Sequence, residues 1–575
     1  MPDSIKCAAL IRHGNALQCI DPPILLDTPS VQTLPFGLDI VLAYHIRTKH
    51  HFRRYAAGPG GLDWASQPDP FRVFGDCPRI ELPLATDLSH VLYADLYHPG
   101  SIAPQALNMR SLATLLELSF GISAWKEYDG TRWALRCNPS SGNLHPTEAY
   151  VVVEACPGID DGVHHYVSRD HLLEQRCRFT RDASGKPLLP APGSFLIGLT
   201  SIHWREAWKY GERAFRYCQH DVGHAVAAAR YAAALLGWRA RVLSAWDDAS
   251  IAAVLGSSRD GDFGDAEREH PDVMLLVTTT SDDASAPAPD VMARAALEGQ
   301  WTGRANVLSP RHLHEWPIIE DVAQACVKQQ SDEPARIASP FPHPARSGCA
   351  ATAAVLIRQR RSAQALDGYT SMPAATFYRM LDMTLPRPDL PPWDAMPWQP
   401  RLHLLLFVHR VDGLAPGLYL FLREPAAEAI LRAHLSSEFD WARVEGCPAH
   451  FSLFRLVAGD ARVAARALSC HQDIAADGTF SLAMLAEYDS SLAEGPWTYR
   501  RLFWEAGMLG QVLYLEAEAA GMRGTGIGCY FDDGVHDLLG IQGHAVQSMY
   551  HFTIGTPLAD TRLQTLPAYA HLKRE

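Results

Sequence analysis

The sequence predicts a mixed α/β (α+β) fold that occurs twice in one chain, so that the two copies pair as an intramolecular pseudo-dimer. The chain has 575 residues. Because single hydrophobic cores stop growing at roughly 250–300 residues, at least two domains are expected. Three features recur in the same order in both halves, which favours a duplicated domain over two unrelated α/β domains.

The first repeated feature is a strand, a turn and a second strand. Residues 146–166 read PTEAYVVVEACPGIDDGVHHY, and residues 400–421 read PRLHLLLFVHRVDGLAPGLYLF. In both segments an apolar run rich in β-branched residues or leucine precedes a turn, and a glycine then leads into an aromatic strand. We therefore expect two neighbouring strands at each of these places.

The second and third repeated features are helices. Residues 221–238, DVGHAVAAARYAAALLGW, parallel residues 505–522, EAGMLGQVLYLEAEAAGM. Both segments are rich in helix formers and stop at a glycine suited to the left-handed position after a helix. An aromatic residue and two aspartates follow in each half, and we expect a second, short helix there that ends at Gly256 or Gly540.

These features predict four parts of the chain. Residues 1–90 form an N-terminal extension and residues 91–280 the first domain. Residues 281–345 are rich in Pro, Ser and Ala near both ends, which is typical of a surface linker, with one or two helices inside it. Residues 346–575 form the second domain.

Composition excludes several classes of protein. The chain is 47% hydrophobic and 20% charged, with a net charge of -13, which argues against non-specific nucleic-acid binding. The N-terminus has no apolar signal region, and no stretch approaches 18 apolar residues, so neither export nor a membrane-bound protein is expected. The 12 cysteines are scattered without a CxxC pair, which favours free thiols and a cytoplasmic location.

A polar loop stands directly before the first predicted strand. Residues 138–153 read NPSSGNLHPTEAYVVV, in which the side chains of Ser140, Ser141 and Asn143 suit hydrogen bonds to a flat polar ligand. Ser, Asn, Gly and Pro are also ordinary turn residues. Judged on the loop alone, a plain turn is the favoured interpretation.

The second half carries two further motifs. IRQRRSAQALDG at 357–368 places Arg360, Arg361 and Ser362 together, and an arginine fork matches phosphate oxygens, although an isolated Arg pair is usually a solvated surface feature. GMRGTGIGCYFDD at 521–533 has glycines that allow a close approach of the backbone to a ligand. Its spacing is that of neither a Walker loop nor a dinucleotide fingerprint.

Together these motifs resemble the nitroreductase superfamily, and SSGNLHPTE resembles its SagB-type, or thiazoline oxidase-like, branch. In that family FMN sits at a dimer interface, so the resemblance implies a nitroreductase-like fold duplicated into a fused dimer. Gln364 departs from the family pattern, which has a basic residue near the flavin N1 and O2 edge. The implied FMN-binding residues are Pro139, Ser140, Ser141, Asn143, Arg360, Arg361, Ser362, Gln364, Gly526, Gly528, Cys529 and Arg562.

The two halves differ at these motifs. Where the second half has GTGIGC, the first has RARVLSA at 239–245, and where the first has PSSGN, the second has PDLPPWDAMPWQP at 388–400. These complementary losses predict one intact FMN site per chain, with the phosphate clamp and glycine strand from the second half. In the first half, Arg47, Lys49 and His50 are either the relic of a second clamp or a basic surface patch.

Lys209 and Tyr210 are adjacent in REAWKYGERAFRYCQHDVGH. Both groups move protons when burial or a neighbouring charge shifts the pKa, but on chemistry alone an ordinary helix start is favoured. The pair resembles the Lys-Tyr motif of azoline dehydrogenases. That resemblance implies that Lys209 and Tyr210 are catalytic and deprotonate the substrate while hydride passes to FMN.

Other chemistries find less support. His164, His165 and His171 lack a carboxylate at ligand spacing, so strand histidines are favoured over a metal site and no metal is expected. The chain has neither a G-x-S-x-G elbow nor an HExxH motif, which leaves serine hydrolase and zincin activities without support.

The sequence thus predicts an FMN-dependent oxidoreductase. The substrate class implied by the resemblance is a carbon–nitrogen centre such as an azoline in a modified peptide or related natural product, with oxygen reoxidising the flavin and other biosynthetic enzymes as partners. One alternative is an NAD(P)H-dependent nitro or quinone reductase. The other is a non-catalytic scaffold in a biosynthetic complex.

Overall fold

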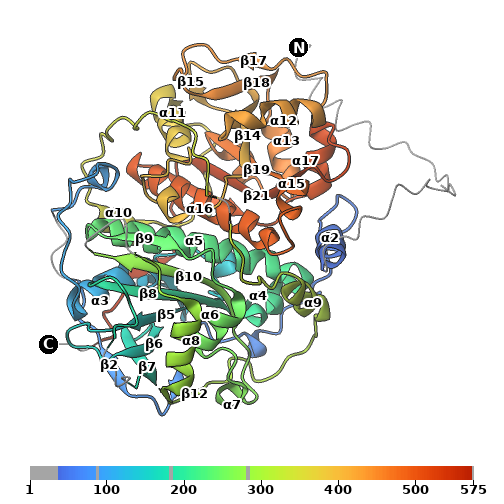
Figure 1. The fold of residues 1–575 in the computed structure, drawn as a ribbon. Helices are drawn as coiled ribbons and strands as arrows, with labels where there is room; N and C mark the ends of the chain where they lie inside the picture. Colours follow the sequence, from blue (N-terminus) through green and yellow to red (C-terminus); the bar gives the residue numbers. More distant parts are fainter. Residues whose placement is uncertain (1–36, 86–89, 181–185, 280–284, 334, 573–575) are drawn as a thin grey trace.

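The computed structural model describes residues 37–85, 90–180, 186–279, 285–333 and 335–572. The N-terminal segment considered for export therefore lies outside the described residues. Two mixed layers of sheet and helix make up the structure, and the two longest helices lie together between the sheets (Figure 1).

The first sheet has the strand order β11-β7-β6-β5-β8-β10-β9, and β2 pairs with β7. All neighbouring strands are antiparallel. The strand pair predicted over 146–166 is confirmed as β5 and β6. The strands are β2 (Arg79–Glu81), β5 (Thr147–Val153), β6 (Gly162–Val167), β7 (Leu172–Arg178), β8 (Ser194–Ser201), β9 (Arg239–Val242), β10 (His270–Thr278) and β11 (Gln300–Trp301).

The second sheet has the order β17-β18-β16-β14-β19-β21-β20, and its six strands from β18 to β20 repeat the positions of β7 to β9, while the edge strands β11 and β17 come from different places in the chain. Its neighbouring strands are antiparallel too. The pair predicted over 400–421 is confirmed as β14 and β16. The strands are β14 (Leu402–Val408), β16 (Gly417–Leu422), β17 (Ala442–Arg443), β18 (Ser452–Ala458), β19 (Phe480–Glu487), β20 (Arg523–Ile527) and β21 (Val546–Gly555).

The predicted long helices are α5 (Ala214–Leu235) and α16 (Thr498–Ala519), which pack against each other more extensively than any other two elements. Each begins before the segment compared in sequence and is followed by a left-handed glycine, Gly237 (φ 72°) or Gly521 (φ 70°). All 22 residues of α5 are buried, which explains why its apolar residues follow no single face.

The short helices that follow are α6 (Asp248–Leu255) and α17 (Asp532–Leu539), and they end at Gly256 and Gly540 as predicted. Before the long helices lie α4 (His203–Tyr210) and α15 (Tyr488–Leu492). The remaining helices are α2 (Leu38–Arg47), α3 (Met109–Ser119), α7 (Asp260–Phe263), α8 (Pro289–Glu298), α9 (Pro317–Ala325), α10 (Ala353–Gln359), α11 (Ala374–Met383), α12 (Glu428–His434), α13 (Arg462–Leu468) and α14 (Ile474–Asp477).

Several short strands tie distant segments together. β12 (Arg304–Ala305) pairs with β1 (Phe74–Gly75), so the segment expected as a linker supplies this strand, β11 and two helices. β22 (Gln564–Leu566) pairs with β3 (Ile122–Tyr128), which also pairs with β4 (Thr131–Arg136). A parallel pair joins β13 (Met372–Pro373) and β15 (Val411–Asp412). Within the described residues, no helix combines the length and apolarity needed to cross a membrane.

Candidate active site

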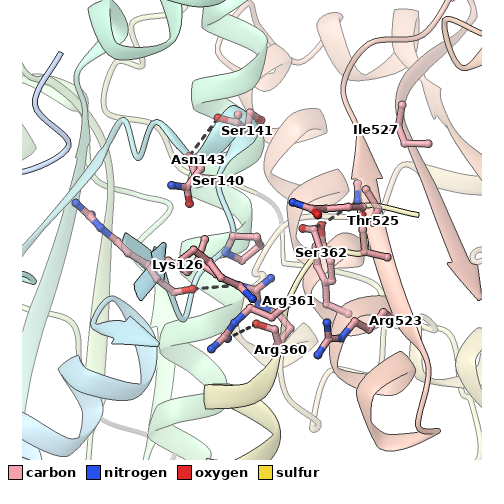
Figure 2. Close-up of a pocket in the computed structure, with 18 of the residues that line it drawn as sticks. Lys126, Ser140, Ser141, Asn143, Arg360, Arg361, Ser362, Arg523, Thr525 and Ile527 are labelled. Carbon is pink, nitrogen blue, oxygen red and sulfur yellow. Dashed lines mark hydrogen bonds between the residues drawn. The ribbon is translucent and has the colours of Figure 1, made fainter. Parts of the chain in front are cut away.

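A cavity of about 760 Å³ opens where the two halves meet. This volume lies within the range of small-molecule sites. The predicted loop before β5 comes from the first half, while Arg360, Arg361, Ser362 and the end of β20 come from the second (Figure 2). Of the residues implied by the resemblance, those that line the cavity are Pro139, Ser140, Ser141, Asn143, Tyr210, Arg360, Arg361, Ser362, Gln364, Gly526, Gly528 and Cys529.

The loop before β5 is held rigidly in the cavity wall. The backbone N–H and the hydroxyl of Ser141 both donate to Oδ1 of Asp221, at 3.1 and 3.3 Å. Asn143 donates to a backbone carbonyl at 2.9 Å, and both Gly142 (φ 59°) and Asn143 (φ 61°) are left-handed. A Cβ on Gly142 would lie 2.5 Å from the hydroxyl of Tyr210, so only glycine fits there. The loop is therefore part of the cavity's construction.

Asp221, on α5, is a buried carboxylate in the cavity wall that the sequence motifs did not single out. Its Oδ2 has no hydrogen-bond partner. Burial raises the pKa of Asp221 to about 7, and the hydrogen bonds from Ser140 and Ser141 only partly oppose that rise. Asp221 therefore takes up a proton in the neutral range.

One end of the cavity is strongly cationic. Arg360 is buried and donates to the carbonyls of Arg136 and Cys137, at 3.0 and 3.3 Å, rather than to a carboxylate. Arg361 donates to Oγ of Ser123 at 3.1 Å. The pKa of Arg361 is lowered to about 10, mainly by burial and then by the charge of the neighbouring Arg360.

Two more cations complete this end, Lys126 on β3 and Arg523 on β20. The pKa of Lys126 is lowered by burial and then by Arg361 and Arg523. A carboxylate oxygen of Glu518 lies 3.4 Å from Nε of Arg523. Figure 2 shows all four cationic side chains at the same side of the cavity, so positive charge exceeds negative charge there.

Sequence reasoning missed Lys126 and Arg523. Arg523 lies inside the glycine-rich segment that was singled out, so its position there was an available signal. No sequence signal pointed to Lys126. It lies on β3, which carries no motif and pairs with β22 near the end of the described residues.

The glycine strand β20 contacts the cavity through its end. The Gly526 N–H donates to the hydroxyl of Tyr514 at 2.9 Å, and that hydroxyl also contacts Oγ of Ser362 at 2.7 Å. The carbonyl of Gly528 accepts from the hydroxyl of Tyr217 at 3.1 Å. Tyr514 of α16 and Tyr217 of α5 therefore both hydrogen-bond to this segment, and both side chains line the cavity.

Tyr210 and Lys209 end helix α4 beside the polar loop. Nζ of Lys209 lies 5.3 Å from the ring centre of Tyr210 and 3.2 Å from the Cβ position of Gly142. Burial raises the pKa of Tyr210 well above its usual range, and the carboxylate of Glu206 raises it further. Tyr210 lines the cavity, and Nζ of Lys209 lies next to Gly142, which also lines it.

Glu206 is a second buried carboxyl that the sequence did not reveal. Neither of its oxygens has a hydrogen-bond partner. Burial raises the pKa of Glu206 well above its usual range, and Asp221 raises it further while Lys209 lowers it. Two carboxyl groups able to hold protons thus stand close to Lys209 and Tyr210.

Arg562 lies away from the cavity lining. Its guanidinium binds Asp560 at 2.7 and 2.9 Å, and its side chain is 70% exposed. Asp560 itself lines the cavity. The phosphate contact that the resemblance implies for Arg562 stays a prediction, and it would require the Arg562 side chain to leave Asp560.

The place equivalent to this cavity by the pseudo-symmetry of the two halves lies between α5 and the segment before β14, and side chains pack together there. Arg230 of α5 binds both carboxylate oxygens of Asp394 at 2.8 and 2.7 Å. The neighbouring Trp393 is 1% exposed, and the guanidinium of Arg423 stacks 4.6 Å from its ring centre. The segment at 388–400 precedes β14 as the PSSGN loop precedes β5, and its buried side chains pack where the PSSGN loop instead borders the cavity.

The remaining sequence candidates have structural partners. His165 lies buried between Glu148 and Glu174, at 3.0 and 3.2 Å. Arg47 is paired with Glu212, and Lys49 with Asp533 at 2.9 Å. Lys49 is buried, so a basic surface patch is the wrong interpretation for that residue.

The repeated sheet, the paired central helices and the cavity between the halves define a tandem nitroreductase-like fold. A solved structure of an Anabaena variabilis protein described as a nitroreductase superposes with a TM-score of 0.61 at 20% identity, covering 90% of this chain and 99% of that one. This likeness over both halves confirms the predicted fold class.

Sequence comparison shows the same resemblance. The chain is 25% identical over 190 residues to a nitroreductase-type protein of Methanocaldococcus jannaschii, covering 32% of this chain and 91% of that protein. It is 37% identical over 111 residues to the trifolitoxin-processing protein TfxB of Rhizobium leguminosarum bv. trifolii, covering 17% of this chain and 29% of TfxB. No protein-family model matches the chain.

Proposed function

We propose that the chain is an FMN-dependent oxidoreductase that dehydrogenates a carbon–nitrogen centre, such as an azoline in a modified peptide or a related natural product. The observation that carries this proposal is the cavity between the halves, cationic at one end and walled by aromatic and small polar side chains. FMN has the matching shape, with a phosphate at one end and a flat polar ring at the other.

The residues present fit FMN by their chemistry. Lys126, Arg360, Arg361 and Arg523 outnumber the nearby carboxylates of Glu518 and Asp560, and such an excess of buried or half-buried positive charge favours an anionic ligand. In the proposed complex these cations and Ser362 hold the phosphate. The loop from Pro139 to Asn143 and the end of β20 border the ring.

When bound, FMN supplies a two-electron acceptor for a hydride from substrate carbon. The substrate also loses a proton from a neighbouring atom as its new double bond forms, and the protein has to accept that proton. Oxygen is the proposed final electron acceptor.

The proton is assigned to Lys209. Because the pKa of Tyr210 is raised, its hydroxyl stays protonated and acts as a hydrogen-bond donor that orients the substrate. In the proposed step Lys209, beside the same loop, reacts as the neutral amine, takes the proton and becomes the ammonium ion. The buried carboxyl groups of Glu206 and Asp221 hold protons next to both residues.

The substrate class rests on the resemblance of SSGNLHPTE and the Lys-Tyr pair to SagB-type and azoline dehydrogenases. The similarity to TfxB, which is named for the processing of trifolitoxin, supports a peptide substrate and a role beside other biosynthetic enzymes. Since this chain covers 29% of TfxB, the peptide substrate and the partners are part of the proposal.

Two measurements test the proposal. Purified protein soaked in FMN and desalted should keep flavin absorbance near 450 nm. A colourless protein would overturn the enzyme proposal and favour a non-catalytic scaffold. The flavin-loaded protein should resist anaerobic bleaching by NADPH. Rapid bleaching would replace the dehydrogenase with an NAD(P)H-dependent nitro or quinone reductase.

A further inference from the structure

Two cysteines touch at the wall of the cavity. Sγ of Cys529, just after β20, lies 2.7 Å from Sγ of Cys470, just after α13. Both are free thiols and both are partly exposed. Cys529 lines the cavity, so this pair stands where the proposed cofactor and the protein meet.

The chain bends unusually to bring Cys470 to this place. Cys470 (φ 52°) and the next residue, His471 (φ 60°), are both left-handed, a conformation that costs a residue with a Cβ roughly 1–2 kcal/mol. Gln472 then donates to the carbonyls of Ser469 and Cys529, at 2.9 and 3.2 Å. The turn is therefore fastened to the end of β20, and the two thiols are held together.

Neighbouring groups shift the pKa values of the two thiols in opposite directions. The pKa of Cys529 is lowered to about 5 by the hydrogen bond from Cys470 and then by His50 and Arg213, against the effect of burial. The same contact raises the pKa of Cys470 far above its usual range, and the nearby carboxylate of Asp532 adds to the rise. A lowered pKa on Cys529 beside a raised pKa on Cys470 is the arrangement of an attacking and a resolving cysteine.

The pair is also accessible. Phe52 and Tyr55, which are 49% and 51% exposed, belong to the segment next to it. The ring of Phe52 lies 6.4 Å from that of His471, and Tyr55 is close enough to both cysteines to have its pKa raised by them. Exposed side chains therefore stand next to the half-buried thiols.

We propose that Cys470 and Cys529 are a redox-active dithiol that closes reversibly to a disulfide by exchange with a low-molecular-weight disulfide. The Cys529 thiolate attacks one sulfur of the small disulfide, forming a mixed disulfide and releasing one thiolate. The Cys470 thiol then loses its proton and attacks Sγ of Cys529, releasing the second small thiol. Two protein thiols are oxidised and one external disulfide is reduced, without FMN.

The experiment titrates the cofactor-free full chain with mixtures of reduced and oxidised glutathione, followed by alkylation and intact-mass and peptide mass spectrometry. The expected product has lost two hydrogens, resists alkylation at two positions and yields a peptide crosslinked between Cys470 and Cys529. Reduction with dithiothreitol should restore both thiols. If both remain open to alkylation at every glutathione ratio, or if either pairs with another cysteine, the proposal is wrong.

Variants separate the two roles. Cys470→Ser should stop at a mixed disulfide, with one glutathione on Cys529, because the resolving thiol is gone. The matched control is Cys447→Ser, a partly exposed cysteine elsewhere in the second half, which should form the crosslink as the wild type does. A Cys470→Ser protein that gains no glutathione would overturn the assigned roles. Since none of these readouts uses flavin, failure of the FMN proposal would leave this result unaffected.

Discussion

Gly507 of α16 lies directly against Gly223 of α5: a Cβ on Gly507 would be 2.9 Å from the Cα of Gly223. These two glycines occupy equivalent positions in the two halves, so the central helices cross at the point of pseudo-symmetry. Backbone meets backbone there, and the close approach sets the spacing between the halves. The cavity depends on that spacing, because its lining comes from both of them.

Gly223→Ala should therefore destabilise the protein by about 2 kcal/mol or more, since the new methyl group would lie 2.7 Å from the Cα of Trp504. Urea unfolding measures the loss. Gly261→Ala is the control, because its Cβ would meet nothing within 4 Å, and it should be neutral or slightly stabilising. Equal stability of the two variants would contradict the close helix crossing.

Arg361→Ala should weaken FMN binding about tenfold to a hundredfold, as expected for the loss of a hydrogen-bonded charge worth about 1.5–3 kcal/mol. Quenching of flavin fluorescence on binding measures the affinity. Arg562→Ala is the matched control, since that side chain is exposed and paired with Asp560. Comparable losses in both variants would show that the cationic end does not hold the phosphate.

Lys209→Ala should keep bound FMN and lose turnover about a hundredfold or more, the usual contribution of a general base. Tyr210→Phe should retain more activity than Lys209→Ala, because its protonated hydroxyl only orients the substrate in the proposed mechanism. Steady-state rates at equal flavin content compare the two. A larger loss of turnover in Tyr210→Phe than in Lys209→Ala would make Tyr210, rather than Lys209, the group that takes the proton.

One FMN should bind per chain, because the ion pair of Arg230 with Asp394 and the buried Trp393 fill the pseudo-symmetric position. The ratio of flavin released by heat to total protein gives the stoichiometry. A ratio near two would mean that this position opens to a second cofactor.

Asp221 should make stability depend on pH. Its pKa is about 7 in the folded protein against 3.8 for an ordinary aspartate, so between these values the folded state holds a proton that the unfolded state has lost. The free energy of unfolding contributed by this group is therefore full below about pH 4 and falls as pH rises to 7, by at most about 4 kcal/mol.

The variant Asp221→Asn removes this titration. Its melting temperature relative to the wild type should rise from pH 5 to pH 8, as measured by thermal unfolding of the cofactor-free protein. Parallel curves for the two proteins would show that Asp221 does not titrate in this range.

Local patterns were sufficient to predict the repeated elements. The alternation from strand to turn to strand, and the helices that stop at Gly237 and Gly521, depend on propensities within one segment. The two halves could be matched for the same reason. The start of α5 lies within the segment interpreted as a helix start, whereas the start of α16 at Thr498 lies before the segment compared and was not predicted.

The sequence by itself determined the repeated fold and the motifs around the cavity. Only the tertiary structure decided which side chains complete that cavity. Lys126 and Cys470 come from segments with no recognisable motif, Asp221 lies in a repeated helix that gave no sign of a buried carboxylate, and Arg562 faces Asp560. The physical reason is that helix and turn propensities act between neighbours in the chain, whereas strand pairing, burial and long-range charge pairing act between groups that meet only after folding.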